Sequence, residues 1–332
     1  MPKLHTLVRA LVIWVCVIAL GLTRGWQDRE LKIFDKLTVL TAPKQSVLPI
    51  TIVGIDEVSF AQIDQRWPWP RSLHAKVVDR LAAAGAAVIA FDVIFSEKSD
   101  PDQDEAFAAA IARAGNVILA ADNIYQESAS VRQWLRVDPT LRLTQAGAAT
   151  GLAAVTLDGD AVIRQVPSAE DAFWRQTIET LLRTRPGIVE RPYVPHGNMI
   201  RHLGPAHTFP YVPIHQVLNG DPKILADYFH DQIVLIGRDV RASPDVGSAQ
   251  ADLFATPFLG SSSQLTTGVE VHATLIENAL TGKTITPAGK GLSLLLLTIA
   301  VVLTLPALIR WHPLWSGLWV AVLMGFVSAG GY

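Results

Sequence analysis

Between residues 50 and 122, short apolar runs alternate with longer segments in which apolar residues recur at helical spacing. The runs are nearly continuous in apolar, largely β-branched residues, as expected for strands that are buried on both faces. Strands and helices that alternate with short links form βαβ units. This part of the chain therefore predicts an α/β fold with a mostly parallel central sheet flanked by helices. The runs are "ITIVGID" (Ile50–Asp56), "AVIAFDVIF" (Ala87–Phe95) and "NVILAAD" (Asn116–Asp122).

Two segments of helical spacing separate these runs, and both have recognisable ends. Residues 72–86 begin at a serine, which is a favourable N-cap, and stop near Gly85, a residue type that often ends helices. Residues 100–115 begin with acidic side chains, which suit the positive end of a helix, and end at Gly115. We therefore expect a helix in each crossover between the predicted strands.

The same pattern returns after a less regular stretch between 124 and 213. That stretch holds short runs that predict short strands, and one helical segment at 170–184. Beyond it, "QIVLIG" (232–237) predicts another buried strand and "GVEVHATLIENALTG" (268–282) predicts a helix. Near the start of the chain, apolar residues at every third position predict an amphipathic helix at 28–40. The α/β pattern therefore extends over most of the chain.

Three uncharged apolar runs near the ends of the chain predict transmembrane helices. Half of the residues are hydrophobic and only 17% are charged, a balance that soluble domains rarely have. A helix needs ~20 apolar residues to cross a bilayer, and we expect each run to supply one. The last two runs are joined only by "RWHP", which predicts a tight hairpin. The runs lie at 10–22, 291–309 and 314–332.

The positive charges around these runs predict how the chain is oriented. Lys3 and Arg9 precede the first run and Arg310 lies in the short loop, and basic residues favour the cytoplasmic side. We therefore expect a multi-pass protein of the inner membrane whose large domain is periplasmic. The first run is also short enough to be the apolar part of a cleaved signal peptide, and that alternative stays open. The predicted regions are a cytoplasmic stub with a transmembrane helix (1–25), the periplasmic domain (26–290), a transmembrane helix (291–309), a cytoplasmic loop (310–313) and a further transmembrane helix (314–332).

The cysteine content and the net charge exclude several kinds of site. The single cysteine, Cys16, falls within the first apolar run, so the domain at 26–290 has no disulfide and no cysteine-based metal site. At ~265 residues, this domain is large enough to bury its own core without such staples. The formal net charge of −2 argues against a nucleic acid partner, which would call for a basic stripe. We expect no cofactor.

Charged residues stand at or just past the carboxyl ends of the predicted strands. Asp56 and Asp92 are two of them, and Arg238 follows the strand at 232–237. Parallel strands end at one edge of a sheet, so these side chains are expected to converge where open α/β sheets bind ligands. Buried acids need a partner, and we expect Arg71 to pair with Asp56 or Asp92. The group is either a structural ion pair or a ligand site.

The segment "RWPWPR" joins the first predicted strand to the first predicted helix. Pro68 and Pro70 restrict the backbone and push Trp67 and Trp69 towards an extended conformation, so that Arg71 begins a sharply defined helix. The two tryptophans have two interpretations. They form a structural lid over the strand ends, or they form the rigid wall of a ligand site at the same edge of the sheet.

Glu270 and His272 lie at the start of the helix predicted at 268–282. Two positions apart on a helix, their side chains point in different directions, which argues against a shared metal ion. If the stretch before Ala273 were extended, the two side chains would share a face and could act together. Both residues are therefore kept as candidate ligand-binding residues.

Two functions without a sensory role remain open on the residues alone. The carboxylates of Asp56 and Asp92 could hold a divalent cation, which would favour a periplasmic metal-dependent hydrolase. The domain could instead be a non-catalytic adhesion or assembly module. A sensor predicts ligand-dependent stabilisation without turnover, a hydrolase predicts metal-dependent turnover, and an assembly module predicts neither.

Several motifs together resemble the CHASE type 2 extracellular sensory domain of bacterial transmembrane receptors. The N-terminal motifs are "VGIDEVSF", "RWPWPR" and "GAAVIAFDVIFSEKSDPDQDEAFAAAI". The C-terminal motifs are "TPFLG" and "TTGVEVHATLIENALTG". The resemblance covers about Trp26 to Lys290 and is weak between 124 and 213.

The resemblance implies a receptor whose periplasmic domain detects an unknown small-molecule or periplasmic signal. It implies one transmembrane helix before the domain, further helices after it, and then an adenylate or guanylate cyclase, a histidine kinase or a serine/threonine kinase. The chain itself is then not an enzyme, and we expect it to act as a homodimer. Since the sequence stops at Tyr332 without such an output domain, we expect a fragment or a stand-alone sensor.

Overall fold

The structure is a computed structural model, and it describes residues 11–310 with gaps at 13, 16, 17, 20, 22, 128–131, 188–191, 193, 196 and 241–251. The chain divides into two compact units. One lies within Met1–Thr41 and Ile285–Tyr332, and the other is Ala42–Thr284, inside the predicted domain at 26–290. Cys16, the greater part of the predicted cytoplasmic loop and the predicted helix at 314–332 lie outside the described residues.

Within the described residues, the larger unit is built on a seven-stranded sheet in the order β4-β3-β2-β7-β1-β6, with β5 also paired to β3. Every pairing in this sheet is parallel except that of β3 with β4. The mostly parallel sheet predicted from the sequence is therefore confirmed. The strands are β1 (Ile50–Asp56), β2 (Val88–Ile94), β3 (Val117–Glu127), β4 (Arg132–Val137), β5 (Ala149–Leu152), β6 (Tyr211–Pro213) and β7 (Ile233–Asp239).

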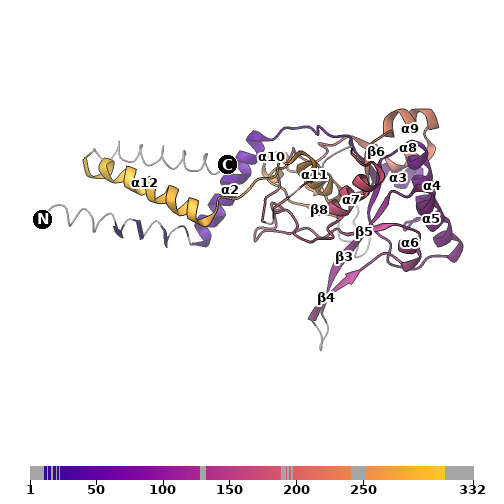
Figure 1. Ribbon diagram of the computed structural model, residues 1–332, viewed down its shortest axis with the longest axis horizontal. Helices are drawn as coiled ribbons and strands as arrows, with labels where there is room; N and C mark the ends of the chain where they lie inside the picture. Colours follow the sequence, from indigo (N-terminus) through magenta and orange to yellow (C-terminus); the bar gives the residue numbers. More distant parts are fainter. Residues whose placement is uncertain are drawn as a thin grey trace. The chain divides into compact units, whose positions relative to one another are not determined.

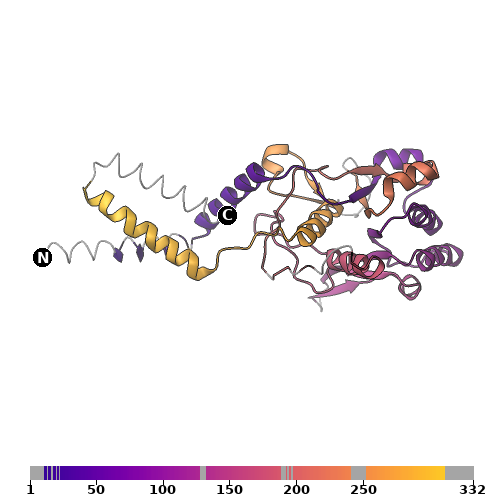
Figure 2. The same ribbon diagram turned by 45° about the horizontal axis from the view of Figure 1, so that its top comes forward.

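Helices cover both faces of the sheet and make a three-layer domain (Figure 1). One layer comprises α3 (Glu57–Gln62), α4 (Arg71–Ala83), α5 (Pro101–Ala114), α6 (Leu141–Gln145), α8 (Ile214–Asn219) and α9 (Pro222–Phe229). The opposite layer comprises α7 (Phe173–Thr184) and α11 (Gly268–Thr281). We call these the α4 layer and the α11 layer. Figure 2 shows the two layers from another direction.

Alternating side chains of each strand fill two separate cores. Ile89 and Phe91 of β2 belong to the cluster beneath the α4 layer, whereas Val88 and Ala90 belong to the cluster beneath the α11 layer. Successive side chains of a strand point to opposite faces, so a strand buried on both faces has no polar positions in its middle. This explains the continuous apolar runs in the sequence.

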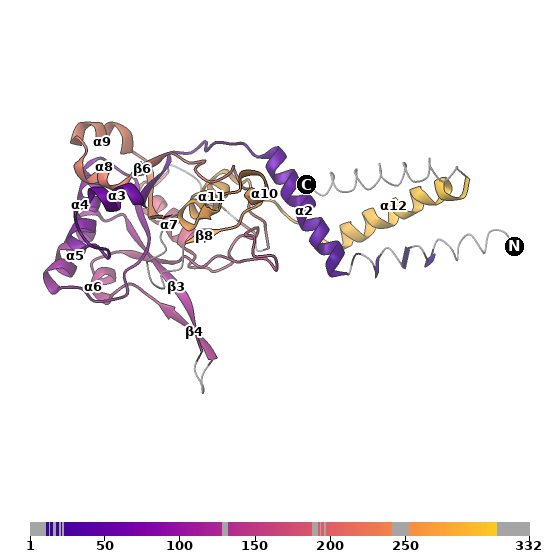
Figure 3. The same cartoon turned by 180° about the vertical axis from the view of Figure 1, so that it is seen from behind.

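The β3–β4 hairpin was not predicted. β3 continues past Asp122, the predicted strand end, and its second half pairs with β4 as an arm that leaves the body of the sheet (Figure 3). The arm is exposed on both faces, and its rings of Tyr125 and Trp134 lie 5.3 Å apart while the Trp134 side chain is 68% exposed. Strands without a buried face leave no hydrophobic alternation, so periodicity could not find them.

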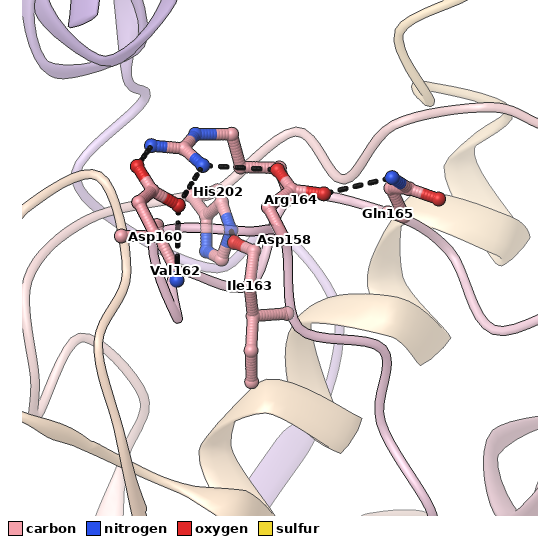
Figure 4. Close-up of polar contacts among 7 residues, drawn as sticks. All are labelled: Asp158, Asp160, Val162, Ile163, Arg164, Gln165 and His202. Atoms are coloured by element: carbon pink, nitrogen blue, oxygen red, sulfur yellow. Dashed lines mark hydrogen bonds and ion pairs between the residues drawn. The ribbon is translucent and has the colours of Figure 1, made fainter. Parts of the chain in front are cut away.

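The irregular stretch contains the predicted helix as α7 and short strands such as β5, and a buried ion network holds the part around Arg164. The side chain of Arg164 is 0% exposed, and its guanidinium contacts the Asp160 carboxylate at two nitrogens, each 2.8 Å away, and Asp158 at 2.9 Å (Figure 4). Gln165 donates to Asp158 at 2.7 Å. Besides β5, this segment makes isolated bridges such as that of Leu157 with Ile163. The network adds to the backbone hydrogen bonds of the same segment, such as that from the Ile163 N–H to the carbonyl of Ala255 at 2.9 Å.

The smaller unit contains α2 (Arg24–Thr41) and α12 (Lys290–Arg310). α2 confirms the helix predicted at 28–40, and within this unit the indole Nε1 of Trp14 donates to Thr298 Oγ1 at 3.0 Å. Of the helices that the structure describes, none combines the length and the apolar composition needed to cross a membrane. The remaining elements belong to the larger unit and are β8 (Leu253–Phe254), α10 (Leu259–Ser262) and β9 (Thr266–Thr267).

Candidate ligand-binding site

Aspartates lie where the parallel strands end, and we call this side of the sheet its carboxyl edge. Asp92 pairs in register with Gly237 of β7, and the pairing of β2 with β3 is irregular between Phe91 and Ile94. Such bulges commonly re-aim side chains near functional sites. Asp92 and Asp122 each follow by two positions a residue of the core beneath the α11 layer. Strand alternation therefore places both carboxylates on the α11 side.

The start of α11 packs very closely against this edge. A Cβ atom built at Gly237 would lie 2.5 Å from the Cβ of Val269, so the helix approaches the strand nearer than any larger residue allows. The backbone N–H of Gly268 donates to the carbonyl of Asp252 at 3.0 Å, and the carboxylate of Asp252 lies against Gly268. The first turn of α11 thus holds a further acid beside the strand ends.

Asp92, Asp122 and Asp252 form one electrostatic group, which we call the acid cluster. Burial, and then the charge of Asp122, raise the pKa of Asp92 to about 7. Burial, and then the charge of Asp92, raise the pKa of Asp252 to about 7, against the opposing influence of His272 and Arg238. Like charges in a poorly solvated site disfavour ionisation of both acids, and that is the physical cause of these shifts.

His272 lies one turn into α11, beside the acid cluster. Its side chain is 2% exposed, and its ring packs against that of Phe173 with the centroids 4.9 Å apart. Burial lowers the pKa of His272 to about 4, although Asp252 and a hydrogen bond with the backbone of Ala153 both favour the charged form. The imidazole is therefore neutral at pH 7.

Three buried polar atoms at the carboxyl edge have no hydrogen-bond partner among the described residues. They are Oδ2 of Asp92, Nδ1 of His272 and Nε of Arg238. Buried polar atoms in native proteins are almost always paired, so these three call for a partner beyond the described side chains, as do Nδ1 of His74 and Nε1 of Trp174 elsewhere in the domain. All three residues were predicted as site residues from the sequence, and this is the group on which a site can be built.

Asp56, another predicted site residue, is fully engaged within the fold. Its Oδ1 accepts a hydrogen bond from the backbone N–H of Ser59 at 2.8 Å and thereby caps α3, and its Oδ2 accepts from the Tyr211 hydroxyl at 3.1 Å. Burial, and then the charge of Asp56, raise the pKa of Tyr211. The position of Asp56 at the carboxyl edge was predicted correctly, but its contacts are structural.

The predicted pairing of Arg71 with Asp56 or Asp92 is wrong. Arg71 Nε lies 3.6 Å from Asp104 Oδ1, and its Nη2 donates to the carbonyl of Glu97 at 2.8 Å. Its guanidinium also lies 4.4 Å from the centre of the Phe95 ring. α4 begins in the α4 layer beside α5, whereas the acid cluster lies on the α11 side, so the sheet edge separates Arg71 from these acids.

Trp67 and Trp69 form an aromatic group with Phe60. The three ring centroids lie 5.1 to 5.7 Å from one another, and the Trp69 side chain is 3% exposed. The guanidinium of Arg238 lies 5.9 Å from the centre of the Trp67 ring. The turn, whose Trp67–Pro68 peptide bond is cis, therefore covers the strand ends as a packed lid. Only Trp67 reaches a residue of the candidate site.

Glu270 holds a neighbouring loop and does not face the acid cluster. Its Oε2 accepts from the backbone N–H of His207 at 2.9 Å, and its Oε1 accepts from that of Thr208 at 2.7 Å. Burial raises the pKa of Glu270 in spite of these two hydrogen bonds. Glu270 and His272 thus point in different directions from one helix, as their spacing predicted.

The described residues contain no group of three or more His, Cys, Asp or Glu side chains placed to hold a metal ion. The hydrolase alternative requires Asp56 and Asp92 to meet on one cation. Both oxygens of Asp56 already accept hydrogen bonds from Ser59 and Tyr211. Nothing in the described geometry therefore favours that alternative.

The sequence reasoning missed two members of the acid cluster. Asp122 ends the predicted run "NVILAAD" as Asp56 ends "ITIVGID", so the same rule could have found it. Asp252 follows the stretch at 241–251 and precedes the two-residue strand β8, and no periodicity or capping signal marks it. Asp252 can be recognised as a member of the acid cluster only in the folded chain, where its carboxylate lies against Gly268.

Comparisons with known proteins give one finding. The family model of the CHASE2 domain matches residues 11–326, nearly the whole chain. No curated protein matches the chain, and no solved structure does. The match covers far more than half of the sequence and includes the sheet, both helical layers and the carboxyl edge. The chain therefore belongs to the CHASE2 domain family.

Proposed function

We propose that this chain is a membrane-anchored receptor that binds a small-molecule signal at the carboxyl edge of its sheet. CHASE2 domains are extracellular sensory domains, so a sensory role outside the cytoplasm follows from the family. Such a domain is not catalytic. The proposal adds the place of binding, the membrane anchor and the passage of the signal to an output domain.

The observation that carries the place of binding is the set of unpaired buried atoms. Asp92, His272 and Arg238 each present one polar atom without a partner among the described residues, at the edge where open α/β sheets bind ligands. A domain that only packs against other proteins would gain stability if apolar residues replaced these groups. Their presence in a buried site supports binding of a polar ligand.

The uncharged runs in the sequence support the membrane anchor. In this arrangement the runs at 10–22, 291–309 and 314–332 cross the inner membrane of a bacterium, and the domain between them is periplasmic. The signal then passes through these helices to a cyclase or kinase, which is the output that the family resemblance implies. Two copies of the chain act together as a homodimer.

The course of the chain supports a role for α11 in this passage. His272 lies in α11 near the acid cluster, and the helix ends at Thr281. The segment 282–289 then leads directly into α12. A ligand can shift an equilibrium between two states only through a difference in its affinity for them. In the proposed mechanism, α11 packs differently against the sheet in the two states. The unpaired polar groups then take different positions, so the ligand has a different affinity for each state.

Reporter fusions test the receptor arrangement. Fusions after Ala42 and Lys290 are expected to report the periplasm, and fusions after His5 and Trp311 the cytoplasm. Enzymes that are active in only one compartment, such as alkaline phosphatase and β-galactosidase, provide opposite readings for each site. A cytoplasmic reading at Lys290 would overturn the membrane-anchored arrangement.

A further inference from the structure

We propose that the carboxyl-edge site binds a small organic cation through a primary ammonium group. The ammonium donates hydrogen bonds to Asp92 Oδ2 and His272 Nδ1, and its charge is balanced by the acid cluster. This inference rests on the proposed function, since it names the chemical class of ligand for the same site. Hydrogen-bond polarity, charge and site geometry each support it.

The polarity of two of the three unpaired atoms favours a ligand that donates hydrogen bonds, whereas the third, Nε of Arg238, is itself a donor. An ionised carboxylate only accepts, so Asp92 Oδ2 requires a donor. His272 is neutral and uses one ring nitrogen towards the backbone of Ala153, which leaves Nδ1 as an unpaired acceptor. An ammonium group offers three donors and no acceptor, so its chemistry suits both of these acceptors.

The charge of the site favours a cation. Asp92, Asp122 and Asp252 act on one another electrostatically, and among the described residues Arg238 and His272 oppose them at Asp252. Burying ionised groups without compensating charge is strongly unfavourable, which is why two of these acids have raised pKa values. A bound ammonium would supply the missing positive charge, whereas an anion would add to the repulsion.

The geometry favours an organic cation over a metal ion. Calcium requires six to eight oxygen ligands and magnesium a near-octahedral set. The described residues hold no group of three His, Cys, Asp or Glu side chains arranged for a metal ion. Asp92 and Asp252 act on each other through space without a shared hydrogen bond among those described. An ammonium on a carbon chain needs no such coordination set, and its apolar part can lie beside Phe173, which packs on His272.

The test uses a pair of ligands that differ only in their ability to donate hydrogen bonds from nitrogen. Ethanolamine carries a primary ammonium, and choline carries the same positive charge and hydroxyl group on a fully methylated nitrogen. The full chain is purified in detergent at pH 8, and binding of each compound is followed by calorimetry and by the midpoint of thermal unfolding. We expect ethanolamine and other primary amines to bind and to raise the midpoint, and choline to bind at least 10-fold more weakly.

Matched variants locate the binding. Asp92→Asn removes the negative charge and replaces one acceptor oxygen by an amide donor, and His272→Phe removes the other proposed acceptor. Each is expected to weaken ethanolamine binding about 10- to 100-fold, the range for one lost hydrogen bond to a charged group. Asp56→Asn changes the acid at the end of β1, which β7 separates from β2 and whose carboxylate oxygens are already engaged, and His74→Phe removes a buried histidine from the α4 layer. These two controls are expected to change the affinity less than 3-fold.

Each other outcome contradicts the inference in its own way. Equal binding of choline and ethanolamine would show that charge alone is recognised. Unchanged affinity in Asp92→Asn, with an intact thermal unfolding transition, would place the ammonium elsewhere. If no primary amine binds while the fusions after Ala42 and Lys290 report the periplasm, the ligand class is wrong and the receptor function stands. If Asp92→Asn only stabilises the chain and no amine binds, the acid cluster holds protons and not a ligand.

Discussion

The two layers of the domain meet the same sheet edge with opposite chemistry. On the α4 side, His74 is surrounded by Phe91, Phe95 and Phe107 with ring centroids 5.1 to 6.0 Å away, and the nearby Arg71 is paired with Asp104. On the α11 side, His272 stands beside an acid cluster with unpaired atoms. Because neighbouring residues of one strand serve opposite faces, the same strand can supply packing to one layer and binding groups to the other.

This comparison shows that burial has a different meaning on each side. The α4 layer covers apolar surface, and the energy of that burial stabilises the fold. The α11 helix is buried along nearly its whole length, yet it carries the buried polar residues Glu270, His272, Glu277 and Asn278. Asn278 exchanges hydrogen bonds with the backbone of Arg201 at 2.7 and 3.0 Å, so polarity away from the acid cluster is satisfied. Among the described residues, buried atoms without a hydrogen-bond partner occur on both sides, with His74 Nδ1 and Trp69 Nε1 on the α4 side and Asp92 Oδ2 and His272 Nδ1 on the α11 side.

The largest expected effect is a loss of packing in the α4 layer. Phe107→Ala removes a ring that is 0% exposed and contacts His74 and both neighbouring phenylalanines. We expect a loss of about 3–5 kcal/mol in the free energy of unfolding, measured with urea on the full chain. The exposed Trp134 provides the matched aromatic control, and Trp134→Ala should cost less than about 1 kcal/mol. Equal losses would mean that the α4 core contributes no more than the exposed arm.

The next-largest expected effect is a gain in the free energy of unfolding, and it concerns Asp92 on the α11 side. The pKa of Asp92 is raised to about 7, so its contribution to stability is present below the unfolded pKa and is lost as the pH rises to about 7. Asp92→Asn removes the ionisable carboxyl group, so the variant does not lose stability in this way as the pH rises. Relative to the wild type, the variant should gain roughly 2–4 kcal/mol between pH 4 and pH 8, shared in part with the coupled Asp252. Thermal unfolding across this pH range measures the difference, and a constant difference would remove the burial argument for Asp92.

His74 gives the mirror image of that pH dependence. Burial, and then the charge of Arg71, lower the pKa of His74 to about 3. Its contribution is therefore present above the unfolded pKa near 6.5 and is lost as the pH falls towards 3. His74→Phe should become more stable relative to the wild type by about 1–2 kcal/mol between pH 6.5 and pH 5. The same thermal unfolding series measures this difference in stability. If the gain of His74→Phe instead grew as the pH rises, as expected for Asp92→Asn, the assignment of the two sides would be reversed.

The smallest effect distinguishes a structural acid from a binding acid at the same edge. Asp56→Ala removes the N-cap of α3 and the acceptor of the Tyr211 hydroxyl. A lost cap of this kind costs about 0.5–2 kcal/mol. Urea unfolding should show this loss at pH 7, where removal of Asp92 should show a gain. If both aspartates respond with the same sign, the distinction between them fails.

The regular part of the fold could be predicted because buried parallel strands have continuous apolar sequences. β1 coincides with the predicted run, and β2, β7, α4, α5 and α11 lie within a few residues of their predicted positions. The β3–β4 arm lacked any buried face, and the stretch around Arg164 depends on ion pairs that no periodicity encodes. Those two regions could be known only from the folded chain.

The candidate site could be predicted in part. Asp92 and Arg238 follow from their places at strand ends, and His272 from its place at a helix start. The partner of Arg71 could not be predicted, because it depends on α5 bringing Asp104 to the start of α4. The unpaired state of an atom is likewise a property of its surroundings. Sequence position gives the edge at which a side chain lies, and packing decides which side chains meet.

The close seating of α11 has a consequence for how the resting state of the domain is set. A Cβ atom at position 237 would lie 2.5 to 3.0 Å from three side-chain carbons of Val269, so even alanine there acts as a wedge beneath the first turn of the helix. Packed interfaces respond to such wedges by switching between discrete seatings and not by bending gradually. A side chain added at position 237 would displace the helix without any ligand, because it would push on the helix from the sheet. The absence of a side chain at Gly237 therefore permits the close packing of α11 on β7, and the size of any residue placed there would set how far the first turn of the helix lies from the sheet.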